Sequence, residues 1–316
     1  MYQEESLKKV AAAMKKLHDA KIYYHKTPDG DAIGSAHALG LALQSQGVRC
    51  ELFCEDQVPD RYHFLTDKFK SDKTENPALI ALDSSSISRL GNYSDAYDFC
   101  IDHHGNNTIP AEYKYVDETS SSCSEIIYHL LVLMGIPVTK PVADLLYAGL
   151  VTDTSCFRTD STNADSLLTA AELARCGADV TKIGRAFTMK KTRARIELES
   201  VLMNNFRYSC GGKALGCFYT YNDLERAGTT DLELEGIGAV VDQVEGIDVG
   251  FIVREKKPGL CRVSVRTYGK CDASKICREF GGGGHADRAG GNIKGKPEDV
   301  MDIVESACGA VLKERS

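Results

Sequence analysis

Short apolar runs alternate with helical patterns through the first half of the chain. The β-type runs are IYYH at 22–25, VRCELFC at 48–54, ALIALD at 78–83 and YDFCID at 97–102. Between the first two lies GSAHALGLALQSQG at 34–47, which has a helical pattern and ends on Gly47, a residue suited to a helix C-cap. Strands separated by helices predict right-handed crossovers, and therefore a mostly parallel sheet with helices on both faces.

The pattern changes further along the chain. Helical segments dominate from Ser122 to about Met203, where TRARIELESVLMNNF is typical of a connecting helix. Beyond it come β-type pieces, a short helix, a glycine cluster and a final helix from Pro297. We therefore predict an α/β protein of two domains, which fits a length of 316 residues. The predicted parts are a larger N-terminal domain at 1–185, a connecting helix or linker at 186–205 and a smaller α/β domain at 206–316.

Composition narrows the class of protein. Apolar residues make up 43% and charged residues 26%, which is typical of a globular chain. The longest apolar run, 126–138, is shorter than the roughly 18 residues that a membrane span needs. The N-terminus lacks the apolar region of a signal peptide, and twelve cysteines without a CxxC pair favour buried, reduced thiols. We expect a cytoplasmic protein that does not enter a membrane.

Net charge limits the size of any nucleic-acid substrate. The chain has 38 lysines and arginines against 45 aspartates and glutamates, a net charge of −7. This balance argues against a broad basic surface that grips a long polyanion. Any nucleic-acid substrate is therefore expected to be short.

Histidines and aspartates gather where the predicted strands end. HKTPDGDAIGS places His25, Asp29 and Asp31 directly after the first strand, and the helix that opens at Gly34 offers free amides to a phosphate. Asp29 and Asp31 also fit an ordinary turn and helix cap, so this segment alone leaves both interpretations open.

Three further positions strengthen the metal interpretation. Asp83 ends the strand at 78–83, and Asp153 ends an apolar helical stretch; each also fits a simple cap. Asp102-His103-His104 follows another strand, and two adjacent histidines are uncommon in a core because each imidazole needs its own buried partner. Together the candidate ligands are His25, Asp29, Asp31, Asp83, His103 and Asp153. Six ligands fit two ions with a bridging carboxylate better than one, and a set without thiolate favours Mn²⁺, with Mg²⁺ or Co²⁺ as alternatives.

Taken in order, these motifs resemble a known family. His25-x-x-x-Asp29-x-Asp31-x-x-Gly34-Ser35, Asp83, Asp102-His103-His104 and Asp153-Thr154 resemble the four motifs of the DHH phosphoesterase superfamily. FGGGGHADRAGG at 280–291, preceded by RVSVRT at 262–267, resembles its DHH-associated C-terminal domain. The resemblance spans nearly the whole chain and is greatest to the standalone NrnA branch. It implies a Mn²⁺-dependent phosphoesterase that degrades very short oligoribonucleotides and removes the 3′ phosphate from 3′-phosphoadenosine 5′-phosphate.

The resemblance also implies roles for single residues in the catalytic domain. His25, Asp29 and Asp83 would hold one ion. The other ion would be held by Asp31, Asp83, His103 and Asp153, with Asp83 as the bridge. His104 would contact the scissile phosphate or protonate the leaving oxygen, and Asp102 would orient its loop.

Substrate choice would fall mainly to the C-terminal domain. The candidate substrate-binding residues are Arg262, Arg266, Gly282, Gly283, Gly284 and His285, with Arg158 from the catalytic domain. Arginine and histidine are charge-assisted donors, and glycines let backbone amides approach a phosphate, although four consecutive glycines also fit a plain turn. Arg288 departs from the family pattern, which usually has small residues after the histidine. This added cation would shift substrate preference unless Asp287 neutralises it.

Other functions share parts of this pattern. A cyclic-dinucleotide phosphodiesterase of the cyclic di-AMP type, or a linear dinucleotide phosphodiesterase, would use the same motifs. A non-catalytic nucleotide sensor would be favoured by the loss of a ligand, and none is missing. A processive RecJ-like nuclease is disfavoured by the short chain and the negative charge, and an inorganic pyrophosphatase by the GGGGH segment. The expected partners are short oligonucleotides, dinucleotides or 3′-phosphonucleotides, and a homodimer is left open.

Overall fold

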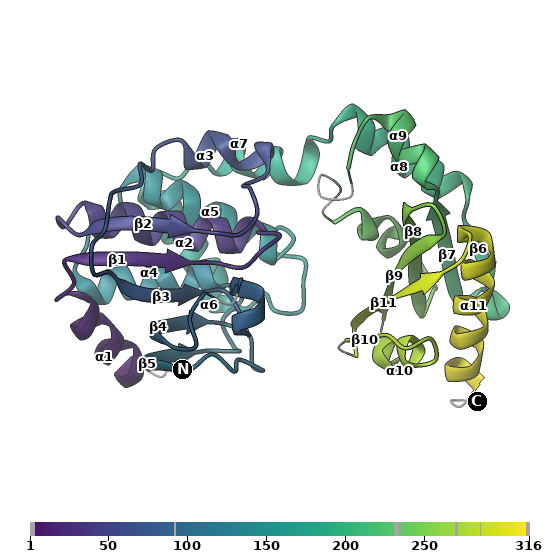
Figure 1. Cartoon of the computed structure of the whole chain (residues 1–316). Coiled ribbons are helices and arrows are strands. Elements are labelled where there is room, and N and C mark those ends of the chain that lie inside the picture. The colour runs from purple at the N-terminus through teal and green to yellow at the C-terminus, as the bar shows by residue number, and fades with distance from the viewer. Residues whose placement is uncertain are drawn as a thin grey trace. The chain divides into compact units, whose positions relative to one another are not determined.

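The computed structural model describes residues 4–91, 93–230, 234, 236–268, 271–284 and 286–313. The chain divides into two compact units, Met1–Lys190 and Lys191–Ser316 (Figure 1). Each unit has its own sheet and its own hydrophobic core. None of the helices in the described ranges is long and apolar enough to cross a membrane.

The first unit contains a sheet of five strands in the order β2-β1-β3-β4-β5. The strands are β1 Asp19–Tyr23, β2 Arg49–Phe53, β3 Ala78–Leu82, β4 Tyr97–Asp102 and β5 Ala111–Val116. Every neighbouring pair is parallel, which confirms the predicted parallel sheet. The chain leaves β1 toward one edge of the sheet and leaves β3 toward the other, so a topological switch point lies between them. Such a point is where α/β sheets bind ligands.

The α-helices of this unit pack on one face of the sheet. They are α1 Glu4–Met14, α2 Gly30–Gln44, α3 His63–Thr66, α4 Cys123–Met134, α5 Lys140–Asp153, α6 Ala164–Arg175 and α7 Val180–Gly184. In Figure 1, α2, α4 and α5 lie behind the strands. They share a core with alternate strand residues such as Ile22, Ile80 and Ile101.

The opposite face is covered differently from the prediction. A second cluster, which includes Tyr23, Ala81 and Cys100, packs there against Leu90 of the 3₁₀ helix η2, Ile87–Leu90, and against Ile109 of a loop. A right-handed crossover places the connection from β3 to β4 on this face. That connection forms only a 3₁₀ helix, so the described α-helices do not cover both faces.

Glycines bring α2 and α5 into close contact. A Cβ atom on Gly34 would lie 2.5 Å from the carbonyl oxygen of Leu145, and one on Gly30 would lie 2.2 Å from Oγ1 of Thr152. On α5, a Cβ on Gly149 would lie 2.8 Å from Oδ1 of Asp31. The two backbones therefore touch, and this contact brings the first turn of α2 to the last turn of α5.

The second unit contains a sheet of six strands in the order β10-β11-β9-β8-β7-β6. The strands are β6 Arg207–Ser209, β7 Ala214–Tyr219, β8 Val249–Lys257, β9 Leu260–Thr267, β10 Gly283–Gly284 and β11 Arg288–Lys294. Strands β7 and β8 pair in parallel, and the other described neighbours are antiparallel. The unit is thus a mixed α/β domain, as predicted.

Helices cover both faces of this second sheet. They are α8 Arg193–Asn204, α9 Tyr221–Ala227, α10 Ala273–Arg278 and α11 Pro297–Lys313, with the 3₁₀ helices η4 Cys210–Gly212 and η6 Ile237–Gln243. Helices α10 and α11 share a core with Val263 and Val265 of β9. Helix α8, within the predicted connecting segment, contributes Leu198 and Leu202 to the core on the other face.

Candidate metal centre

The candidate ligands of the first unit come from the carboxyl ends of its strands and from two helix ends. His25 follows β1, Asp83 follows β3, and His103 follows β4. Asp29 is the N-cap of α2, where its Oδ1 accepts hydrogen bonds from the amides of Asp31 and Ala32 at 3.1 Å. The remaining candidates lie in the first turn of α2 (Asp31) and at the end of α5 (Asp153). Parallel strands end at one edge, so segments distant in the sequence meet there.

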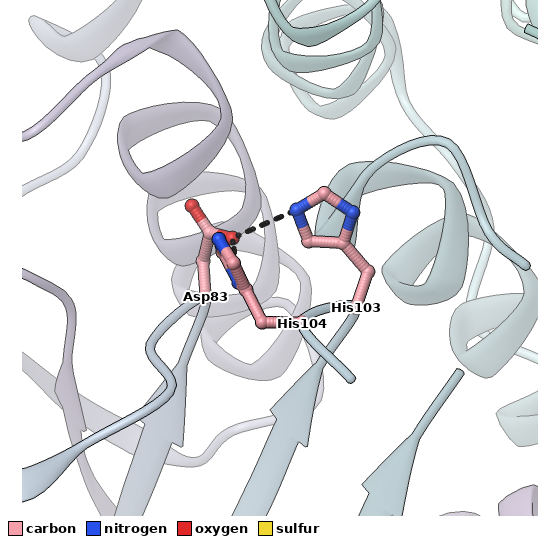
Figure 2. Close-up of side chains that lie close together, drawn as sticks. All are labelled: Asp83, His103 and His104. Atoms are coloured by element: carbon pink, nitrogen blue, oxygen red, sulfur yellow. Dashed lines mark ion pairs between the residues drawn. The ribbon is translucent and has the colours of Figure 1, made fainter. Parts of the chain in front are cut away.

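The six candidates form two groups that share Asp83. In the first group, Nε2 of His25 lies 3.5 Å from Oδ2 of Asp29 and 3.6 Å from Oδ2 of Asp83. In the second, Nε2 of His103 lies 3.5 Å from Oδ1 of Asp83, 3.6 Å from Oδ2 of Asp153 and 4.0 Å from Oδ2 of Asp31. Each carboxylate oxygen of Asp83 thus faces a different histidine. Figure 2 shows Asp83 beside His103 and His104.

Both histidines present the same nitrogen to the carboxylates. Nδ1 of His25 lies 2.9 Å from the carbonyl oxygen of Lys26, and Nδ1 of His103 lies 3.4 Å from that of Ser120. A carbonyl only accepts, so Nδ1 carries the proton in each ring, and Nε2 of the neutral ring keeps its lone pair. A ring held by its other N–H is typical of histidines that bind metal ions.

Asp31 is fixed by the N-terminus of α4. Its Oδ2 accepts a hydrogen bond of 2.6 Å from the amide of Cys123, and its Oδ1 accepts one of 2.9 Å from the amide of Ser124. The positive end of a helix dipole favours a carboxylate at this position. The side chain is buried, with 1% exposure, so its place in the group is set by the fold.

The electrostatics of the cluster fit a divalent cation. Burial, together with Asp83 and Asp153, raises the pKa of Asp31 well above its ordinary value, and burial raises that of Asp153 to about 6. Burial alone would lower the pKa of His103, but the nearby carboxylates outweigh it and raise that pKa to about 9. Oδ1 of Asp83 is buried and has no hydrogen-bond partner. A cation would neutralise the crowded carboxylates and bind this orphaned oxygen.

His104 is held by a buried aspartate. Asp102 has 0% exposure, and its Oδ1 accepts hydrogen bonds from Nδ1 of His104 at 2.7 Å and from the amide of His103 at 2.9 Å. Burial alone would raise the pKa of Asp102. The hydrogen bond from His104 helps to hold that pKa below its ordinary value. Because Nδ1 donates to Asp102, Nε2 of the half-buried His104 ring is left for chemistry.

Sequence reasoning missed Asn107, which supports the same loop. Its Nδ2 donates to Oδ2 of Asp102 at 2.7 Å and to the carbonyl oxygen of Ser84 at 2.8 Å. The side chain therefore joins the loop after β4 to the loop after β3. An amide residue shortly after Gly105, in DHHGNN, was the available signal.

A left-handed turn follows Asp153. Ser155, Cys156 and Phe157 have φ values of 47°, 61° and 61°. Oγ1 of the buried Thr154 holds the turn, because it accepts a hydrogen bond of 3.0 Å from the amide of Phe157 and donates one of 2.6 Å to the carbonyl oxygen of Leu150. Phe157 packs partly against the core, whereas Arg158 is exposed beyond it.

The candidates in the second unit lie in different surroundings. Arg262 and Arg266 are on β9, where Nη1 of Arg266 donates to Asp242. A Cβ on Gly282 would lie 2.6 Å from the carbonyl oxygen of Gly290, and one on Gly284 would lie 2.6 Å from Cα of Ala289, so close backbone packing explains these two glycines. Gly283 has open space at that position. His285 lies outside the described residues.

These features define an α/β protein whose first unit carries a carboxylate–imidazole metal centre at the switch point of its sheet. The chain belongs to the DHH family. Residues 20–150 match the model of the DHH family N-terminal domain, and residues 217–313 match that of the DHHA1 domain. The family that the sequence motifs indicated is therefore confirmed.

Relatives match this chain over nearly its whole length. The "Bifunctional oligoribonuclease and PAP phosphatase NrnA" of Thermus thermophilus is 30% identical over 98% of this chain and 94% of its own. The Bacillus subtilis protein of that name is 27% identical over 92% and 96% of the two chains. The crystal structure of an exopolyphosphatase-related protein from Bacteroides fragilis has a TM-score of 0.88 at 22% identity, over 97% and 96% of the two chains, and shows the same fold.

Proposed function

We propose that this protein is a Mn²⁺-dependent phosphoesterase that hydrolyses very short oligoribonucleotides and removes the 3′ phosphate from 3′-phosphoadenosine 5′-phosphate. The observation that carries the proposal is the buried Asp83, which turns one carboxylate oxygen toward each of two ligand groups. The names of the Thermus and Bacillus relatives support the choice of substrates. A cytoplasmic location belongs to the same proposal.

Within this proposal, two divalent ions occupy the two groups. His25, Asp29 and Asp83 hold the first ion, and Asp31, Asp83, His103 and Asp153 hold the second. Carboxylates and imidazoles without thiolate favour Mn²⁺, with Mg²⁺ or Co²⁺ as alternatives. When bound, a pair of such ions lowers the pKa of water and offsets the negative charge of a phosphate ester.

His104 then acts on the substrate, and Asp102 orients it. Asp102 keeps the proton of His104 on Nδ1 and leaves the lone pair of Nε2 available. His104 contacts the scissile phosphate or holds a proton for the leaving oxygen. Asp102 is a positioning residue in this scheme, and Asn107 supports it from the neighbouring loop.

Substrate binding is assigned to arginines of both units and to the glycine cluster with the histidine that follows it. The proposed residues are Arg158 in the first unit and Arg262, Arg266, Gly282, Gly283, Gly284 and His285 in the second. Of the described glycines in this group, Gly283 has the space that a phosphate would need above the backbone, so it is the better candidate for direct contact. Gly282 and Gly284 act through the packing of β10 on β11.

A direct assay compares substrates. Purified protein with Mn²⁺ is incubated in parallel with a dinucleotide, a 20-mer, 3′-phosphoadenosine 5′-phosphate and cyclic di-AMP. We expect the dinucleotide and 3′-phosphoadenosine 5′-phosphate to be hydrolysed fastest. Faster hydrolysis of cyclic di-AMP would instead identify a cyclic-dinucleotide phosphodiesterase, and absence of any Mn²⁺-dependent hydrolysis would contradict the proposal.

Variants test the proposed roles in the same assay. Asp153→Asn should abolish turnover and weaken Mn²⁺ binding, whereas Asp160→Asn, at an exposed carboxylate nearby, should change neither. His104→Ala should lower kcat by about 10²-fold while the protein retains its metal ions. Activity of Asp153→Asn equal to that of wild type would remove Asp153 from the centre.

A further inference from the structure

Four arginines lie on one face of the second sheet. Arg262, Ser264 and Arg266 alternate along β9 with the buried Val263 and Val265, so these three residues point away from the core of α10 and α11. In the antiparallel register, Arg288 of β11 lies directly opposite Arg266, and Arg254 of β8 lies directly opposite Arg262. Opposed residues share a face, so two pairs of like charges meet there.

Such pairs are unfavourable unless an anion offsets them. Side chains directly opposite each other in an antiparallel pair lie about 5 Å apart at Cβ, and like charges at that spacing are destabilising. For Arg266 the protein supplies the anion, because Asp242 accepts hydrogen bonds from Nη1 of Arg266 and from the hydroxyl of Tyr268. The side chains of Arg266 and Asp242 are only 25% and 28% exposed.

Arg288 has no comparable partner in the part of the chain described. The side chain of Arg288 is 60% exposed, and its ion pair is with Asp287, 3.8 Å away and 71% exposed. An ion pair this open to water contributes little. Asp287 therefore leaves most of the charge of Arg288 available to a ligand.

The backbone beside Arg288 is accessible to such a ligand. Gly290, on the same face of β11, pairs with Gly283 of β10, and a Cβ on Gly283 would have nothing within 4 Å. Gly283 therefore leaves the backbone of β10 uncovered near the exposed guanidinium of Arg288. A phosphate suits this combination of an arginine and uncovered backbone.

We propose that Arg288 is a substrate-binding residue that determines specificity. It binds a second phosphate of the substrate, beyond the ester that is hydrolysed, and so favours nucleotides with two phosphate groups over those with one. This assignment rests on the proposed function, which places substrate on Arg262 and Arg266. Because Asp242 already binds Arg266, binding of this second phosphate depends mainly on Arg288.

The test measures binding in the absence of hydrolysis. Isothermal titration calorimetry of the full chain in EDTA compares 3′-phosphoadenosine 5′-phosphate with adenosine 5′-monophosphate for wild type, Arg288→Ala and Lys294→Ala. Lys294 is an exposed cation on the same strand and face, about 20 Å from Arg288 at the strand rise per residue. We expect the wild type and Lys294→Ala to bind 3′-phosphoadenosine 5′-phosphate more tightly than adenosine 5′-monophosphate. In Arg288→Ala, the ratio of the two affinities should be about tenfold smaller. Arg288→Lys should keep part of it, because it keeps the charge but not the planar fork.

Two results would overturn the role of Arg288: an unchanged preference in Arg288→Ala, or an equal loss in Lys294→Ala. Arg288→Ala should fold, since the residue is exposed and its removal relieves repulsion with Arg266; an unchanged far-ultraviolet circular dichroism spectrum verifies this. Mn²⁺-dependent hydrolysis by the wild type is assayed separately. Failure there would contradict the proposed function, while the calorimetry still decides what Arg288 binds.

Discussion

At the scale of single residues, the turn after Asp153 places three consecutive non-glycine residues at positive φ near the metal centre. The left-handed region costs a non-glycine residue about 1–2 kcal/mol of conformational energy, and such residues usually adopt it singly. Ser155, Cys156 and Phe157 occupy it consecutively, beside a candidate ligand. The two hydrogen bonds of Thr154 keep the turn in place. Strain of this kind is typical of functional sites, where the surrounding fold fixes the geometry.

Ser155→Gly should therefore stabilise the protein. Glycine adopts φ near 47° without the clash of a Cβ atom, so we expect the free energy of unfolding to rise by about 1 kcal/mol. Urea denaturation followed by circular dichroism measures the change. Ser161→Gly is the matched control, because Ser161 has no positive φ and should lose a little stability from the added freedom of the unfolded chain. A gain of the same size in both variants would show that the turn is not strained.

This turn also marks where prediction from sequence ends for single residues. The candidate ligands were found because acids and histidines gather at the ends of apolar runs or in the turns that follow them. The left-handed turn could not be found, because serine, cysteine and phenylalanine carry no signal for positive φ as glycine does. Asp242, which binds Arg266, was missed for a similar reason: a contact between residues far apart in the sequence leaves no local pattern.

At the scale of elements, one edge strand was predictable and the other was not. The runs 78–83 and 97–102 coincide closely with the inner strands β3 and β4, because buried parallel strands are continuously apolar. The run 48–54 also coincides with β2, although β2 lies at an edge of the sheet. Strand β5, AEYKYV, alternates with charged residues at the sheet edge and escaped detection. Helix α2 begins at Gly30, earlier than the predicted 34, because Asp29 caps it. The cap and the ligand interpretations of Asp29 are thus compatible.

Gly34→Ala tests the contact between α2 and α5. A methyl group would lie 2.5 Å from the backbone oxygen of Leu145, so the helices must separate, and we expect a loss of about 1–3 kcal/mol in the free energy of unfolding. Gly184→Ala is the control, because Gly184 has helical φ and ψ and open space at Cβ, and alanine there should be neutral or stabilising by up to about 1 kcal/mol. Equal effects in thermal or urea unfolding would contradict the close contact.

The pairing of β1 with β2 should depend on pH. Asp19 and Arg49 face each other in the register, and Nε and Nη2 of Arg49 donate to the carboxylate at 2.5 and 2.7 Å. Arg49 lowers the pKa of Asp19 in the folded state. The stabilisation is therefore complete above the unfolded-state pKa of about 3.9 and is lost as the pH falls through the lower, folded-state value.

Asp19→Asn should consequently be less stable than wild type at pH 7, and the difference should shrink when both proteins are measured near pH 3. Urea unfolding at the two pH values gives the comparison. Asp160→Asn, at an exposed carboxylate, is measured in parallel as the control. A difference that stays constant from pH 7 to pH 3 would mean that the carboxylate of Asp19 is not held by Arg49.

At the scale of the whole molecule, charge is distributed unevenly between the two units. Four aspartates crowd the candidate metal centre of the first unit, and four arginines share one face of the sheet in the second. The chain as a whole still carries a net charge of −7. The arginines are therefore concentrated where they can bind a small anion, whereas the net negative charge of the chain disfavours binding of a long polyanion.

This distribution predicts both the length preference and its response to salt. The slope of log affinity against log salt is about −0.7 per phosphate contacted on a single strand, so contacts with one to three phosphates give a slope between about −0.7 and −2. We expect kcat/KM for a dinucleotide to exceed that for a 20-mer and to fall only this gently between 50 and 200 mM KCl. If the 20-mer is preferred, with a slope near −4 or steeper, the protein must grip several phosphates along a strand. The arginines on β8, β9 and β11 would then belong to an extended binding track, because a pocket for one small nucleotide cannot contact so many phosphates.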